Sequence, residues 1–182
     1  MKNMTTKEFC RKFRACKDGT RFALKYKTMR ECYDALLNGE AGGWAVWTYV
    51  RAAKEKERVR FALWCANRVR HLMTDKRSTD ALNAVQRWLD GEKVDLKESA
   101  ADACQAAYSA NPDQASAAAY HTAYTAYQAA YADFSAESAY YAAFFAAYYA
   151  YAADADHAVA EAAQIAHLRE LGNPFEEDGE DD

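Results

Sequence analysis

Apolar residues recur at helical spacing along the first 110 residues of the chain. Val59, Leu63, Ala66 and Val69 lie three or four positions apart, which is the period of one face of an α-helix. Two other segments show the same period, at Met29, Cys32, Tyr33, Leu36 and Leu37 and at Ala81, Leu82, Val85, Trp88 and Leu89. The pattern predicts a helix at each of these places, the longest of them over residues 53–73.

Polar residues and helix breakers predict where the helices begin and end. Thr5-x-x-Glu8 and Thr28-x-x-Glu31 are capping boxes, in which side chains satisfy the first free amides of a helix. The first box is expected to open a basic amphipathic helix that ends near Gly19. Other predicted boundaries are an N-cap at Ser78 or Thr79, a stop at Gly91, a start at Asn111-Pro112 and a stop at Gly172-Asn173-Pro174.

Alanine and aromatic residues dominate the chain after Glu98. Residues 98–171 include 30 Ala, and Tyr and Phe recur between them at a 4-3-4-3 spacing that places them along one seam of a helix. The first row is Tyr120, Tyr124, Tyr127, Tyr131, Phe134, Tyr141, Phe145 and Tyr148, and the second is Tyr140, Phe144 and Tyr151. The rows are either core, with hydroxyl groups at its edge, or a Tyr-rich docking surface.

Helix breakers are rare, with two Pro and seven Gly among 182 residues. This composition predicts an all-α protein, a multi-helix array or bundle with an Ala/Tyr-rich C-terminal half and no sheet. We expect four segments: basic N-terminal helices at 1–50, a helical core at 51–111, Ala/Tyr-rich helices at 112–174 and an acidic disordered tail at 175–182.

Charge is divided along the chain. Residues 1–97 contain 22 Lys and Arg against 12 Asp and Glu, whereas residues 98–182 contain 1 against 15. Such a division bears on partners rather than on fold. The whole chain has a net charge of −4 and shows no nucleic-acid-binding motif, so we do not expect direct nucleic-acid binding. The candidate partner-binding residues are Arg11, Lys12, Arg14, Tyr140, Tyr151, Glu176, Glu177 and Asp178.

Cysteine usage and hydropathy predict a cytoplasmic protein. The five cysteines form no C-x-x-C motif, and the first residues contain no apolar run of the signal-peptide kind. The uncharged runs at 114–132 and 138–153 approach the length of a membrane span but lack Leu, Ile and Val, so we expect no membrane insertion. No catalytic motif, phosphate-binding loop or metal-ligand pair is present, and we expect no cofactor and no metal.

Three motifs in residues 61–92 resemble a known family. They are W-C-A-x-R-V-x-x-L at 64–72, D-x-R-S-x-x-A-L at 75–82 and W-x-x-G-E at 88–92, and an Ala-rich stretch follows them. The segment is similar to the immunity-protein family of bacterial toxin–immunity loci and to related Ala-repeat helical proteins of unknown function. The L-R-E-L-G-N-P-F segment at 168–175 is similar to the same proteins.

The resemblance implies a non-enzymatic, stoichiometric inhibitor that binds and occludes a protein partner, either a toxin or a defence effector. An alternative is a phage-encoded anti-defence inhibitor of the anti-CRISPR kind, whose acidic half imitates the charge of a nucleic acid. A second alternative is a metal-dependent enzyme that uses Asp154, Asp156, His157 and His167.

Overall fold

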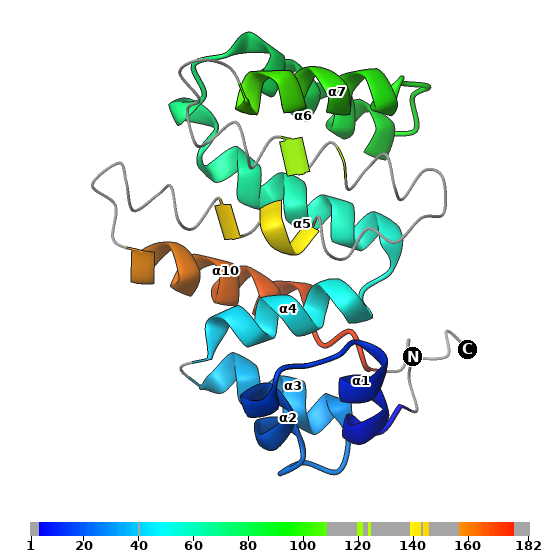
Figure 1. The fold of residues 1–182 in the computed structure, drawn as a ribbon, viewed down its shortest axis with the longest axis vertical. Helices are drawn as coiled ribbons and strands as arrows, with labels where there is room; N and C mark the ends of the chain where they lie inside the picture. The colour runs from blue at the N-terminus through cyan, green and yellow to red at the C-terminus, as the bar shows by residue number, and fades with distance from the viewer. Residues whose placement is uncertain are drawn as a thin grey trace. The chain divides into compact units, whose positions relative to one another are not determined.

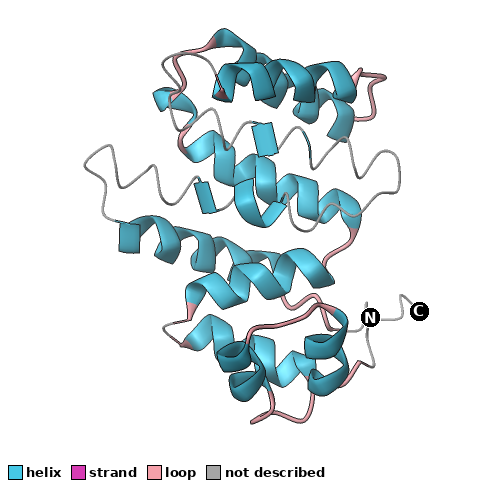
Figure 2. Cartoon of the chain, in the orientation of Figure 1, coloured by secondary structure: helices cyan, strands magenta, loops and turns pink. Residues whose placement is uncertain are grey.

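A computed structural model shows an all-α protein, as predicted (Figure 1). The residues that it describes are 4–39, 41–108, 120, 121, 124, 139–142, 144, 145 and 157–176. Among them, every regular element is a helix (Figure 2). The β-type pairing of these residues is limited to one isolated bridge between Thr5 and Thr28. No helix in these ranges is long and apolar enough to cross a membrane.

The chain divides into two compact units. Unit 1 consists of Met1–Ala52 and Ala162–Asp182, and unit 2 consists of Ala53–Glu161. The helices of unit 1 are α1 (Thr6–Lys12), α2 (Lys17–Ala23), α3 (Met29–Asn38), α4 (Gly42–Ala52) and the greater part of α10 (His157–Leu171). Those of unit 2 are α5 (Glu55–Arg68), the 3₁₀ turn η1 (Arg70–Leu72), α6 (Lys76–Leu89) and α7 (Leu96–Ala107).

Both predicted capping boxes are present, and they open α1 and α3. The single helix expected from Thr5 to Gly19, however, is two short helices. Helix α1 ends at Lys12, and Arg14 adopts a left-handed backbone with φ of 52°. The Ala15 amide then donates to the Cys10 carbonyl at 2.9 Å. This turn reverses the chain, and α2 begins after it.

The core of unit 1 joins its first helices to its last residues. The Phe9 ring lies 6.0 Å from Trp47 of α4 and 5.5 Å from Phe175. Phe175 also packs against Tyr33 of α3 at 6.2 Å and is only 4% exposed. The predicted tail boundary at residue 175 is therefore wrong: Phe175 is core, and Glu176 is held by Arg30. Residues 177–182 lie outside the described residues.

The core of unit 2 is built from α5, α6 and α7. The fully buried residues of α5 include Val59, Phe61 and Cys65, and α7 contributes the alanines Ala103 and Ala106. Small side chains on α7 let its backbone come close to α6, which packs along it. The helix predicted over 53–73 ends earlier, at Arg68, and η1 follows.

Three other predicted features of unit 2 and α10 can be compared with the structure. The N-cap of α6 is Asp75 rather than Ser78 or Thr79, because the Asp75 carboxylate accepts from the Arg77 amide at 2.9 Å. The predicted stops are confirmed: Gly91 follows α6 and Gly172 follows α10, both with positive φ. The start at Asn111-Pro112 lies outside the described residues.

Candidate functional site

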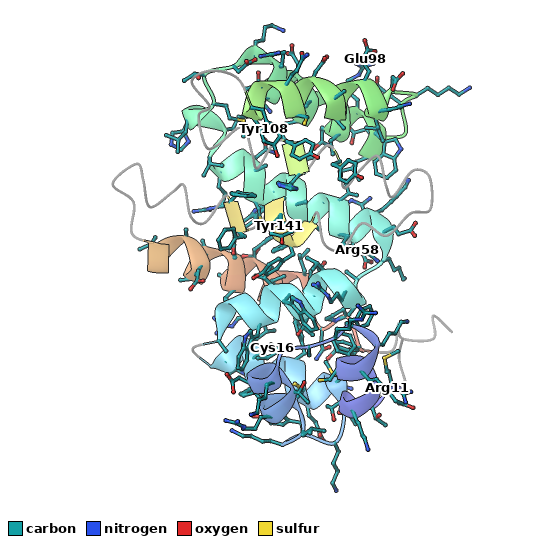
Figure 3. The ribbon with its side chains drawn as sticks, in the orientation of Figure 1. Arg11, Cys16, Arg58, Glu98, Tyr108 and Tyr141 are labelled. Carbon is teal, nitrogen blue, oxygen red and sulfur yellow. The ribbon has the colours of Figure 1, made fainter. Side chains whose placement is uncertain are left out.

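The most strongly charged described surface is a cationic lobe formed by residues 7–27, which include α1 and α2. The segment carries eight Lys and Arg against two acidic residues, Glu8 and Asp18. All eight cations are exposed: Lys7, Arg11, Lys12, Arg14, Lys17, Arg21, Lys25 and Lys27. Arg11 and the exposed Cys16 are labelled on this lobe in Figure 3. The turn at Arg14 gathers the charges of two helices into one short, folded-back segment.

The two carboxylates of the lobe are engaged locally. Glu8 accepts the Thr5 amide at 2.9 Å in the capping box, and this hydrogen bond is the main cause of the lowered pKa of Glu8. Asp18 lies 3.5 Å from Arg21 on the same helix. Glu8 also interacts with the charge of Arg11, three residues later on α1. Both Arg11 and Arg14 are exposed.

Half-buried aromatic rings support the cationic lobe from beneath. The Phe13 ring lies 4.7 Å from Phe9, and the Lys12 ammonium lies 5.2 Å above it. In the same way, Phe22 packs against Trp44 of α4 at 5.8 Å and beneath Lys25 at 5.5 Å. These contacts hold both short helices in place and keep their ammonium groups at the surface.

The C-terminal end of unit 1 is attached to helix α3. The Glu176 carboxylate lies 3.1 Å from the Arg30 guanidinium, and both groups are exposed. The Asn173 side-chain amide donates to the Arg30 carbonyl at 3.2 Å and to the Asp34 carboxylate at 2.8 Å. Arg169 donates to the Leu37 carbonyl. The chain thus arrives at residue 176 already in contact with the N-terminal helices.

An aromatic cluster surrounds His121 in unit 2. The His121 ring stacks on Phe145 at 5.2 Å and lies 5.3 Å from Tyr141 and 4.8 Å from Tyr120. Burial among these rings lowers the pKa of His121 to about 4, so the ring is neutral at pH 7. Rings one helical turn apart also stack, as Tyr120 does on Tyr124 at 5.9 Å.

The described members of the aromatic rows are partly exposed. Tyr141 is 39% and Phe144 45% exposed, whereas the alanines beside them, Ala139 and Ala142, are completely buried. At these positions the alanines are therefore core, whereas the rings beside them are partly exposed. Tyr108, at the end of α7, is 80% exposed.

The predicted partner-binding residues that the structure describes are divided between the two units. The basic set at 11–14 and Glu176 belong to unit 1, and Glu176 is already paired with Arg30. Tyr140 belongs to unit 2, where it is half-buried with its ring 5.9 Å from Tyr141. Tyr151, Glu177 and Asp178 lie outside the described residues.

Most of the alternative metal site lies outside the described residues. No group of three His, Cys, Asp or Glu side chains in the described ranges could hold a metal ion. His167 lies 3.0 Å from Glu170. Asp154 and Asp156 and the side chain of His157, from the alternative metal site, are outside the described residues. Cys10 and Cys32 are buried, and burial raises the pKa of the Cys32 thiol to about 12, which makes it unreactive at pH 7.

Negative charge in the described part of unit 2 is partly compensated. Asp75 lies 2.7 Å from Arg77, and Glu92 lies 2.6 Å from Arg87. Asp80 is held by Lys76 one helical turn away. All three carboxylates lie before residue 98, outside the acidic half of the sequence, and each is paired with a cation of its own segment.

Several arginines have positions that the sequence analysis did not predict. Arg51 is buried with its guanidinium 4.1 Å over the Trp47 ring, and Arg68 lies 5.2 Å over Trp64. Both pairs have Trp and Arg four residues apart on a helix, and this spacing is a usable signal. The Arg30 contact with Glu176, by contrast, joins residues 146 positions apart, and no local pattern indicates it.

Comparison of the chain with protein-family models, with curated proteins and with solved structures finds no match.

Proposed function

We propose that this protein is a non-enzymatic, stoichiometric inhibitor that binds a protein partner through the cationic lobe and occludes the partner's surface. The observation that carries the proposal is the set Arg11, Lys12 and Arg14 at the end of α1. All three side chains are exposed. A local excess of exposed positive charge of this kind steers association with an acidic surface and fixes its orientation.

The way the lobe is held supports a binding role. Rings beneath the lobe pack against α4 and against Phe175, and Arg14 occupies a defined left-handed turn. A surface that is already ordered loses less conformational entropy when it binds, so more of the interaction energy appears as affinity. Arginine also suits the task, because its planar guanidinium pairs with a carboxylate through two hydrogen bonds.

The resemblance to immunity proteins supports the class of function and the kind of partner. Its motifs at 61–92 include the buried positions Cys65, Ala66 and Leu82, so in this chain they serve the helical framework of unit 2. A toxin or a defence effector with an acidic working surface is the partner that the lobe fits. The five free thiols suit action in a reducing cytoplasm.

The test has two stages. The full chain is first used to capture its partner from the native host, with identification by mass spectrometry. The affinity of that partner is then measured for wild type, for Arg11→Glu/Lys12→Glu/Arg14→Glu, and for a control with the exposed unit 2 cations reversed, Arg60→Glu/Lys93→Glu/Lys97→Glu.

We expect the lobe variant to lose affinity by at least about tenfold, mainly through a slower on-rate that is sensitive to salt, and the control to keep it. Equal losses in both variants, or no loss in either, would contradict binding through the lobe. Circular dichroism and thermal unfolding of each variant establish that the substitutions leave the fold intact.

A further inference from the structure

Two cysteines lie on either side of the chain reversal between α1 and α2. Cys10 is part of α1 and is buried, whereas Cys16 is the N-cap of α2 and is exposed (Figure 3). The Ala15 amide donates to the Cys10 carbonyl at 2.9 Å, and Cys16 is the next residue along the chain. The left-handed turn at Arg14 therefore brings a buried thiol and an exposed thiol to the same place in unit 1.

Side-chain contacts place both sulfur atoms at the first turn of α2. The Cys16 Sγ accepts the Gly19 amide at 3.3 Å. The Cys10 thiol shares a hydrogen bond with the side chain of Thr20, whose hydroxyl also donates to the Ala15 carbonyl at 3.4 Å. Burial raises the pKa of the Cys10 thiol, the hydrogen bond with Thr20 lowers it, and the charge of Cys16 raises it. The two thiols are therefore close enough for the charge of one to act on the other.

We propose that Cys10 and Cys16 are a redox-active pair, which a low-molecular-weight disulfide such as oxidised glutathione converts into an intramolecular disulfide. The exposed Cys16 thiolate attacks one sulfur of the reagent, forms a mixed disulfide and releases the other half of the reagent as a thiolate. The Cys10 thiolate then attacks the Cys16 sulfur and releases the second half. Two cysteine thiols are oxidised, one disulfide is reduced to two thiols, and the cysteine protons pass to the released thiolates.

The different exposure of the two thiols sets the order of the steps. Cys10 is only 7% exposed, so a bulky reagent reaches Cys16 first. The second step needs no access from solvent, because the mixed disulfide forms beside the buried thiol. The exposed cations Arg14 and Lys17 lie within two residues of Cys16 and attract an anionic reagent such as oxidised glutathione. A thiol held nearby acts at an effective concentration on the order of millimolar or above, so the mixed disulfide is resolved rather than accumulated.

Oxidation removes the side-chain cap of α2. A Cys16 sulfur that turns to Cys10 leaves the Gly19 amide, one of the first amides that the helix itself leaves without a partner. The first turn of α2, which carries Lys17, is then less ordered. A less ordered surface loses more entropy when it binds, so the reduced protein is the form that binds a partner. This consequence rests on the proposed function, whereas the disulfide chemistry does not.

The test treats the full chain with oxidised glutathione at about pH 8, where a larger share of each thiol is ionised than at neutral pH. The product is digested with trypsin and analysed by mass spectrometry. Trypsin cuts after Arg11, Lys12 and Arg14, so a bond between Cys10 and Cys16 appears as two separate peptides joined by a disulfide. We expect this joined pair to be the main product at Cys16 in wild type, and dithiothreitol to reverse it.

Three variants, each checked for folding by circular dichroism, test the roles of the sulfur atoms. Cys10→Ala should accumulate at least about tenfold more of the Cys16–glutathione mixed disulfide than wild type, because it lacks the thiol that expels glutathione. Cys16→Ala should leave Cys10 reduced. Cys32→Ala removes the other buried thiol of unit 1 and should form the joined pair as wild type does.

Several outcomes overturn the inference. They are a lack of reaction at Cys16, a mixed disulfide that accumulates equally in wild type and in Cys10→Ala, and a bond from Cys10 to Cys32 in place of the expected one. Hydrogen exchange at the Gly19 amide, followed by NMR, should be at least about threefold faster in the oxidised protein, and an unchanged rate contradicts the loss of the cap. None of these measurements contains a partner, so their results do not depend on whether the partner-binding proposal is correct.

Discussion

Truncating Phe175 tests whether the C-terminal segment belongs to the core of unit 1. The side chain is 4% exposed and meets the rings of Phe9 and Tyr33 edge-on, at 5.5 and 6.2 Å. Replacing a buried Phe by Ala costs about 3–5 kcal/mol, which includes the loss of edge-to-face contacts of about 0.5–1.5 kcal/mol each. We therefore expect Phe175→Ala to lower the unfolding free energy of unit 1 by about 3 kcal/mol or more.

Two truncations serve as matched controls for Phe175→Ala. A chain that stops after Glu176 keeps every described contact of unit 1, and it should lose no more than about 0.5 kcal/mol, as for a change away from packed or paired groups. A chain that stops after Phe175 loses the exposed Arg30–Glu176 ion pair as well, and such pairs contribute about 0–1 kcal/mol. The large loss should appear only when the Phe175 ring itself is removed.

The assay is urea denaturation followed by tryptophan fluorescence. Trp64→Phe and Trp88→Phe are introduced into every variant, so that the remaining indoles, Trp44 and Trp47, report on unit 1. Trp47 is well placed because its ring lies 6.0 Å from Phe9. A loss below about 1 kcal/mol for Phe175→Ala, within the range of an ordinary surface change, would refute the assignment of this residue to the cooperative core.

Three other residue environments lead to predictions. The buried Tyr33 hydroxyl has no hydrogen-bond partner in the described ranges. Tyr33→Phe should therefore leave the unfolding free energy in urea unchanged or raise it by up to about 1 kcal/mol. A decrease of more than about 1 kcal/mol would contradict this prediction. Trp64 and Trp88 are half-buried, beneath Arg68 and Lys56 respectively. Replacing either by Ala should therefore lower the unfolding free energy, measured by thermal unfolding, by about 1–2 kcal/mol rather than the roughly 3–5 kcal/mol of a core ring. A loss of about 3–5 kcal/mol would show that the ring is core. The unfolding free energy of unit 2 should fall as pH drops from about 6.5 to about 4, because the unfolded chain protonates His121 before the folded chain does. In the His121→Phe variant this part of the pH profile should flatten. If the wild-type and variant profiles run parallel, His121 is not the cause.

Local hydrogen bonds explain why some helix boundaries could be predicted and others could not. The capping boxes at Thr5 and Thr28 involve residues three apart, so the sequence alone contains all their atoms. The reversal at Arg14 has no such signal, because the left-handed conformation is usually taken by Gly or Asn and falls here on an arginine. Asp75 was missed as an N-cap because Ser78 and Thr79 have equally suitable side chains, and Ser78 proves to be buried within α6.

The candidate site was predictable only in its charges. Exposure of Arg11 and Lys12 follows from their position on a short amphipathic helix, but the left-handed turn that holds Arg14 and the ring contacts beneath the charges depend on tertiary packing. Phe175 lies among acidic residues after a helix stop, a context typical of a solvated tail. Its burial depends on Phe9 and Tyr33, more than 140 positions away, which no local pattern could indicate.

The division of charge along the sequence does not carry over to the compact units. Residues 1–52 contain 11 Lys and Arg against 5 Asp and Glu, and residues 162–182 contain 1 against 7, so unit 1 as a whole is balanced at 12 against 12. A partner therefore meets no strongly basic unit. It meets a local concentration of positive charge in residues 7–27, tethered to a local concentration of negative charge. At physiological ionic strength, fields of exposed charges extend about 8 Å. The salt dependence of binding should then reflect the few cations at the contact rather than the net charge of either half of the chain.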